Sequence, residues 1–343
     1  MNAQKRRIVK KRKKKRKILR RILLLFILFL IGIAIYFVYL GISAYNAANN
    51  SYEELINRDG KSKLREKAVN IKKDPFSILF IGVENYSSGK KSYGRSDTLM
   101  LATFDPKNST MKLLSIPRDT KVYIEDLGKR DKINHAFAKG GKESTIDTIE
   151  NFLDIPIDYY ATINFDGFVD IVDILGGVTV NVPFDFWDYK NGDSSTKFYF
   201  KKGKMTLNGE EALTYVRMRK KDPRGDFGRN ERQREVLKAL IDEALKPSSL
   251  LKIDKITKEI GNNVETNFKI DYLLALREKY ADFKTSNIET LTFEGQDDYT
   301  NGTYYFLPDE DSIDKIKSIL KIHLGLSQDN GYYNNDDENT DQT

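Results

Sequence analysis

The sequence predicts an α/β domain in which helices cover both faces of a mixed β-sheet, preceded by one transmembrane helix. Short apolar runs typical of buried strands alternate with segments whose apolar residues have helical spacing. Gly, Pro, Asn and Asp separate these segments, as expected of turns. An uncharged apolar stretch at residues 22–40 is long enough as a helix to cross the hydrocarbon core of a membrane.

Positive charge is concentrated before this apolar stretch. The 343-residue chain has a formal net charge of +7, but thirteen lysines and arginines, and no acidic residue, lie in residues 1–21. Subtracting these thirteen leaves about −6 for the remainder. A net-acidic domain is a poor non-specific ligand for phosphate backbones, so no nucleic-acid partner is expected.

The same asymmetry predicts the topology. Basic residues on one side of the stretch place the N-terminus in the cytoplasm, so the chain is expected in the cell membrane as a single-pass type II protein. A cleaved signal peptide is the alternative, but its apolar region is usually shorter. The absence of cysteine excludes disulfides and cysteine-based zinc sites.

The individual elements follow from local patterns. Strands are expected at 76–82, 98–104, 111–116, 159–164, 178–182 and 288–293, with 98–104 and 111–116 joined as a hairpin. Helices are expected at 144–153, 165–175, 208–213, 230–245, 250–260, 270–282 and 309–324. Residues 188–196, rich in Gly, Asp and Ser, are expected to form a loop.

These elements suggest a division of the chain into six parts. They are a basic tail at 1–21, the transmembrane helix at 22–40, a polar stalk at 41–73, a main domain at 74–246, a C-terminal lobe at 247–326 and a disordered tail at 327–343.

Arginines and carboxylates gather in three separated segments, each at a strand end or in a loop. The first contains Glu84 and residues 95–97, the second is 115–119, and the third is 217–233. Binding sites of α/β folds assemble in crevices at strand ends. Arginine forks match phosphate oxygens, so several converging arginines indicate a ligand with more than one negative charge, such as a pyrophosphate. Carboxylates among them would suit Mg²⁺ bound together with phosphate oxygens.

Two plainer interpretations remain open. Any one of these arginine–carboxylate pairs could be an ordinary surface ion pair. The aromatic-rich residues 184–189 could line an acyl tunnel or fill the core, and buried aromatics favour the core.

The segments together resemble the LytR-CpsA-Psr family of Gram-positive cell-wall enzymes, in particular its teichoic acid transferases of the TagU and MsrR type. The resemblance covers residues 73–245. The matching stretches are ILFIGVE at 78–84, GRSDT at 94–98, LSIPRDT at 114–120, KINHAF at 132–137, IPIDYY at 155–160, LGGV at 175–178, LNGEEAL at 207–213, RMR at 217–219, GDFGR at 225–229 and RQ at 232–233. Glu84 is a departure, because much of the family has Asp there.

This resemblance implies a role for each matching residue. Mg²⁺, with Mn²⁺ as the alternative, would be held by Glu84 and Asp97. Catalysis would involve Asp97, Arg118 and Asp226, with Asp97 ranked first as the base and Asp226 orienting the arginines. The pyrophosphate of the carrier would be bound by Arg95, Arg118, Arg217, Arg219, Arg229 and Gln233.

The expected function is transfer of an anionic glycopolymer, wall teichoic acid by resemblance, from a polyprenyl-pyrophosphate carrier to a peptidoglycan sugar hydroxyl. The expected partners are therefore this lipid-linked polymer, peptidoglycan and the membrane. The rivals are a pyrophosphate phosphatase that uses water, a transcriptional regulator of the cell envelope, and a non-catalytic polymer-binding protein.

Overall fold

The computed structural model describes residues 52–327 except 57, 85–93, 253–254, 256–262 and 281–282. The expected basic tail, transmembrane helix and almost all of the C-terminal tail lie outside these residues. None of the helices in the described part of the chain combines the length and apolar character needed to cross a membrane.

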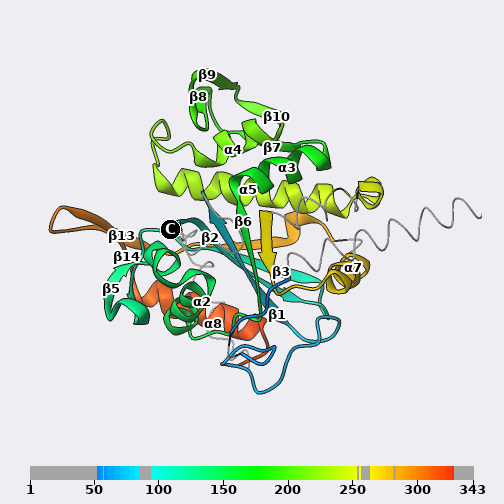
Figure 1. The fold of residues 1–343 in the computed structure, drawn as a ribbon, viewed down its shortest axis with the longest axis vertical. Helices are drawn as coiled ribbons and strands as arrows, with labels where there is room; N and C mark the ends of the chain where they lie inside the picture. Colours follow the sequence, from blue (N-terminus) through cyan, green and yellow to red (C-terminus); the bar gives the residue numbers. More distant parts are fainter. Residues whose placement is uncertain are drawn as a thin grey trace, which may run out of the picture. The chain divides into compact units, whose positions relative to one another are not determined.

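The centre of the fold is a mixed sheet of six strands in the order β11-β6-β1-β2-β3-β12 (Figure 1). Strand β1 pairs parallel with β6 and antiparallel with β2, and β3 pairs antiparallel with β2 and parallel with β12. Its strands are β1 Phe76–Val83, β2 Ser96–Asp105, β3 Thr110–Ser115, β6 Tyr159–Asn164, β11 Val264–Thr266 and β12 Ile288–Leu291. The predicted mixed α/β fold is thus confirmed.

Alternate residues of the central strands pack on opposite faces of the sheet, as the period of two requires. Leu79 and its cross-strand partner Leu101 lie in one core with buried residues of helices α2 (Asn134–Leu153) and α8 (Glu310–His323). Met100 and Ala102 lie in a second core against Leu237 of helix α5 (Asp226–Leu245). Figure 1 shows α5 on one side of the sheet and α2 and α8 on the other.

Most predicted helices are present, two of them with earlier starts, while most of the predicted helix at 250–260 lies outside the described residues. Helix α2 begins ten residues before the predicted 144, because the chain is already helical from Asn134 and is only interrupted at Gly140 and Gly141, whose backbone angles are non-helical. Helix α5 begins four residues before the predicted 230. The helices are α2 Asn134–Leu153, α3 Phe165–Leu175, α4 Gly209–Arg217, α5 Asp226–Leu245, α7 Ile270–Lys279 and α8 Glu310–His323, with short 3-10 turns η1 Glu125–Leu127, η2 Pro247–Lys252 and η3 Thr285–Asn287.

The predicted loop at 188–196 is wrong. It falls within a hairpin, because Gly192 takes a positive φ of 73° and lets the chain reverse between two paired strands. Three further two-stranded units were not predicted as pairs. The strands outside the central sheet are β4 Lys121–Ile124, β5 Lys129–Lys132, β7 Val178–Val182, β8 Phe186–Lys190, β9 Asp193–Phe200, β10 Gly203–Leu207, β13 Gly295–Thr300 and β14 Thr303–Pro308.

Both ends of the described chain pack on the sheet and its helices. Arg58, within the expected stalk, forms a buried ion pair with Glu150 at 2.7 Å and a partly exposed one with Asp147 at 2.5 Å, both on α2. In the expected C-terminal lobe, β12 extends the central sheet, and Leu320 of α8 is fully buried in the core with Leu79. The hairpin β13–β14 extends from this body at the left of Figure 1.

Candidate active site

Three strand ends meet at one edge of the sheet and carry the first group of predicted residues. Glu84 directly follows β1, Asp97 is the second residue of β2, and Arg118 follows β3. Because β2 runs antiparallel to both neighbours, its start lies beside their ends. Residues distant in the sequence are therefore brought together by the sheet.

The second group lies on the helix pair α4 and α5. A capping box, in which Asn208 and Glu211 bond each other's backbone N–H, fixes the start of α4. Helix α4 ends at Arg217, and α5 begins at Asp226 and carries Arg229 and Gln233 on its first turns. At Gly228, a Cβ atom would lie 1.9 Å from an Asp222 carboxylate oxygen, so only glycine permits this close approach.

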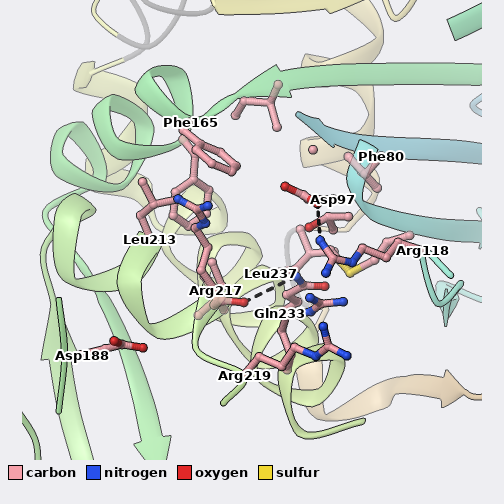
Figure 2. A pocket seen from close by; sticks show the side chains of 18 of the residues that line it. Phe80, Asp97, Arg118, Phe165, Asp188, Leu213, Arg217, Arg219, Gln233 and Leu237 are labelled. Carbon is pink, nitrogen blue, oxygen red and sulfur yellow. Dashed lines mark hydrogen bonds and ion pairs between the residues drawn. The ribbon is translucent and has the colours of Figure 1, made fainter. Parts of the chain in front are cut away.

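One ion pair lies within the first group and is drawn in Figure 2, and another joins the first group to the second. Arg118 Nη1 lies 2.5 Å from Asp97 Oδ1, and Arg217 Nη2 lies 3.3 Å from Glu84 Oε1. The guanidinium of Arg217 also stacks over the Phe165 ring at 4.5 Å.

Asp226 lies between two arginines. Its Oδ2 is 2.7 Å from Arg219 Nη2, and its Oδ1 is 2.5 Å from Arg229 Nη2. The single carboxylate therefore holds both arginines in fixed positions. This geometry agrees with the orienting role that the resemblance implies for Asp226.

The electrostatics of the cluster favour an added anion. Burial disfavours the charge of Arg118, but Asp97, then Asp119 and Asp226, outweigh it, so the pKa of Arg118 is raised. For Arg229 the balance is reversed. Burial, together with the nearby charges of Arg118 and Arg219, outweighs Asp226 and lowers the pKa of Arg229. Its Nε is buried without a hydrogen-bond partner among the described residues, which leaves a donor available to a ligand.

All nine predicted site residues line one of two adjoining cavities. The polar cavity, of about 810 Å³, is lined by Glu84, Arg95 and Asp226. The apolar cavity, of about 1260 Å³, is lined by Arg229 and Gln233. Of the predicted site residues, four line both cavities: Asp97, Arg118, Arg217 and Arg219.

The apolar cavity lies between the sheet and the helix pair. Phe80 and Met100 line it from the sheet, and Leu213, Val236 and Leu240 line it from α4 and α5. Figure 2 shows Phe80, Leu213 and Leu237 around the space next to the arginines. The site therefore joins a deep apolar space to a charged one.

Glu84 and Asp97 fit the predicted metal site by their chemistry. Each uses one carboxylate oxygen for the ion pair described above, which leaves its second oxygen for a cation. Mg²⁺ is usually held by one or two carboxylates, substrate phosphates and water. Among the described residues, no group of three or more histidines or carboxylates is placed to hold a metal by itself, so phosphate oxygens would have to complete the coordination.

Several residues of the site were given no assigned role from the sequence. Lys132 Nζ lies 2.7 Å from Asp119 Oδ1, and both line the polar cavity beside Tyr304 from the C-terminal hairpin. Arg232, only 2% exposed, bonds Asp222 and the backbone oxygens of Tyr215 and Met218, and so fixes the loop that follows α4. The sequence shows only that Arg232 lies ten residues after Asp222. That the two side chains form a buried ion pair cannot be recognised without the fold.

The aromatic-rich segment 184–189 divides between the two alternatives left open by its sequence. Phe186 is buried in a core with Phe200 and Tyr215. Trp187 and Tyr189 line the apolar cavity instead.

The chain matches a family model and several known proteins over most of its length. Residues 38–322 match the model of the LytR_cpsA_psr family. The chain is 51% identical over 307 residues to the polyisoprenyl-teichoic acid–peptidoglycan teichoic acid transferase TagV of Bacillus subtilis (strain 168), covering 88% of this chain and 77% of that protein. It is 44% identical to TagU, named as the same kind of transferase, of Halalkalibacterium halodurans, covering 85% and 93%.

A solved structure extends the comparison to the fold. The structure described as TagT bound to LIIa-WTA is 35% identical, with a TM-score of 0.67, covering 80% of this chain and all of that one. The match to the family model spans the sheet, both helix layers and every predicted site residue. This chain therefore belongs to the LytR_cpsA_psr family.

Proposed function

We propose that this protein transfers an anionic glycopolymer, wall teichoic acid by similarity to TagV and TagU, from a polyprenyl-pyrophosphate carrier to a peptidoglycan hydroxyl. The observation that carries the proposal is the position of the arginines at the junction of the polar and apolar cavities. A ligand with a long apolar tail, a diphosphate and a polar polymer has its parts in this same order.

The apolar cavity suits the prenyl chain. Ligand pockets are typically about 300–1,000 Å³, and this one, at about 1260 Å³, is larger. Burial of each methylene of the chain would contribute about 0.8 kcal/mol. The diphosphate next to it would receive hydrogen bonds from Arg118, Arg219 and Arg229.

The reaction is a phosphoryl transfer. The acceptor oxygen attacks the phosphorus that carries the polymer, a new P–O bond forms, the bond to prenyl phosphate breaks, and the hydroxyl proton passes to a base. Such transfers depend on alignment and charge neutralisation more than on covalent catalysis, which arginine clusters provide. Asp97 is the proposed base, since its carboxylate lies at the junction of both cavities; because Oδ1 is paired with Arg118, Oδ2 would have to serve both as metal ligand and as proton acceptor.

Bound Mg²⁺ would neutralise charge on the diphosphate and withdraw electron density from the phosphorus. Glu84 and Asp97 are the residues proposed to hold it, with Mn²⁺ as the alternative ion. The proposed location is the cell membrane, in a single-pass type II orientation with the site outside. The basic tail and the apolar stretch at 22–40 support this orientation.

The proposal is tested with the full chain in detergent micelles. A lipid-pyrophosphate disaccharide and peptidoglycan oligomers are supplied with Mg²⁺, Mn²⁺ or EDTA, and products are measured by mass spectrometry. We expect metal-dependent acceptor-linked product, lost in Arg118→Ala. The control variant is Arg130→Ala, since Arg130 is exposed on β5 and lines neither cavity.

The rivals give different outcomes. Prenyl phosphate released without an acceptor adduct would favour a phosphatase. Binding of the donor without turnover under any metal would favour a polymer-binding protein. Binding of DNA by residues 1–21 would favour the regulator.

A further inference from the structure

The β13–β14 hairpin lines the polar cavity together with several arginines of the site. Its side chains Asp297, Tyr299 and Tyr304 line the cavity together with Arg118 and Arg219. The diphosphate proposed above would bind to the arginines of this cavity. The part of the cavity that the hairpin lines then has no assigned ligand.

The hairpin is fixed to the loop that carries Arg118. Phe306 N–H donates to Asp119 O at 3.0 Å, and Phe306 is buried. On the other face of the hairpin, Lys121 Nζ lies 3.0 Å from Asp298 Oδ2. The hairpin therefore holds its cavity-facing side chains at a set distance from the reacting groups.

The cavity-facing side of the hairpin exposes aromatic rings. Tyr299 is 70% exposed, and its ring lies 5.5 Å from that of its cross-strand partner Tyr304. Phe227, which also lines the cavity, is 51% exposed and packs edge-on against Phe306 at 6.0 Å. Exposed aromatic faces beside a cavity indicate a ligand with an apolar surface of its own.

Polar groups with unused hydrogen-bonding capacity lie beside these rings. Asp297 accepts the Tyr304 hydroxyl at 2.9 Å and has a second carboxylate oxygen. Asn134, only 4% exposed, also lines the cavity, and its Oδ1 has no hydrogen-bond partner within the described ranges. Their free oxygens accept hydrogen bonds, and Asp297 would repel a phosphate. The nearby Lys132 ammonium is paired with Asp119 at 2.7 Å, so this part of the cavity suits a neutral ligand with hydroxyl donors.

A pyranose ring combines these properties, since it has a flat face of C–H groups and an edge of hydroxyls. We propose that Tyr299, Tyr304, Asp297 and Asn134 form a saccharide-binding subsite that holds a sugar ring beside the diphosphate. The identity of that sugar rests on the proposed function, in which both the donor and the acceptor carry a sugar next to the reacting phosphate.

The test uses the full chain in detergent micelles and three variants. Tyr299→Ala removes the exposed ring, Tyr299→Phe keeps it, and Tyr123→Ala is the matched control, since Tyr123 is 55% exposed on β4 and lines neither cavity. Binding of lipid-free peptidoglycan disaccharide, and of the sugar phosphate of the donor, is measured by saturation-transfer NMR without any turnover. KM and kcat are then measured for donor and acceptor separately.

We expect Tyr299→Ala to weaken saccharide contact and to raise one KM by about three- to tenfold, the range that loss of one aromatic contact implies. Tyr299→Phe should recover most of the loss. A rise in KM for the acceptor alone assigns the subsite to peptidoglycan, and a rise for the donor alone assigns it to the transferred polymer.

Failure of the subsite and failure of the proposed function are distinguishable. Saccharide contact that depends on the Tyr299 ring, in a protein without transfer activity, would sustain the subsite and reject the transferase. Active protein in which Tyr299→Ala and Tyr123→Ala both match the unmodified chain in saccharide contact and in both KM values would overturn the subsite.

Discussion

Replacing Arg229 with lysine separates the charge of this side chain from its hydrogen-bonding geometry. Arg229 is 6% exposed and contacts Asp226 through Nη2 at 2.5 Å, while its Nε has no partner among the described residues. Lysine keeps the positive charge that Asp226 requires. Lysine has one donor nitrogen in place of the three of the guanidinium, so it loses the two that are proposed to bind phosphate oxygens.

The expected loss follows from one charge-assisted hydrogen bond. Such bonds contribute about 1.5–3 kcal/mol, and about 1.4 kcal/mol corresponds to a factor of ten in affinity. Diphosphate affinity in Arg229→Lys should therefore fall by roughly ten- to 150-fold. The positive charge of the lysine alone should not maintain the affinity for diphosphate.

The assay is isothermal titration calorimetry of the full chain with inorganic pyrophosphate at fixed ionic strength, which keeps screening constant. Arg130→Lys is the control, because Arg130 is exposed and lines neither cavity. Thermal unfolding of both variants establishes that they are folded. Folded Arg229→Lys protein that binds pyrophosphate as tightly as the unmodified chain would refute the assignment of Nε to the ligand.

Three further predictions concern stability and the apolar cavity. Burial, then the charge of Lys112, lowers the pKa of His323 to about 4, so the folded state favours neutral imidazole and its contribution to stability, complete above about pH 6.5, is lost as the pH falls from there to about 4; urea denaturation should show this pH dependence weakened in His323→Gln. Arg58→Ala leaves Glu150 buried without its ion pair and should lower the free energy of unfolding by about 3–5 kcal/mol in the same measurement at neutral pH; a loss below 1 kcal/mol would contradict this. Leu240→Trp should raise KM for a long-chain donor at least about tenfold, because displacing two methylenes from the apolar cavity costs about 1.6 kcal/mol. KM for a short-chain donor should not rise. Equal effects on both donors would show that the prenyl chain does not bind in this cavity.

The sequence was most informative where a local pattern and a buried face coincide. The strand at 76–82 and the helix at 165–175 have apolar patterns that match their observed packing closely. The site residues were found because their motifs match those of the family in the same order along the chain. That they converge follows from strand directions, which place the start of β2 beside the ends of β1 and β3.

Two hairpins were missed although a signal was present. Asn191–Gly192 and Asn301–Gly302 are Asn-Gly pairs, which favour tight hairpin turns, and Asn301 and Gly302 have φ values of 51° and 74°. The flanking strands are polar on their exposed sides, so their alternation was weak and composition favoured loops. Consequently the hairpin that carries Tyr299 beside the polar cavity was not predicted.

Buried charged pairs were the other omission. Arg232 with Asp222 and Arg58 with Glu150 connect segments that pack only in the folded chain. The sequence shows such residues as ordinary charges, because burial depends on tertiary contacts rather than on local pattern. The expected stalk looked polar for this reason.

The central claim is that the phosphoryl group that carries the polymer is transferred from prenyl phosphate directly to an acceptor oxygen, and not to water. The direct measurement is the reaction of the full chain with donor and peptidoglycan oligomers in ¹⁸O-labelled water, followed by mass spectrometry of all phosphorus-containing products. The expected products are an acceptor-linked phosphodiester and prenyl phosphate, both free of ¹⁸O. Incorporation of ¹⁸O into a released sugar phosphate, with no acceptor adduct, would contradict it.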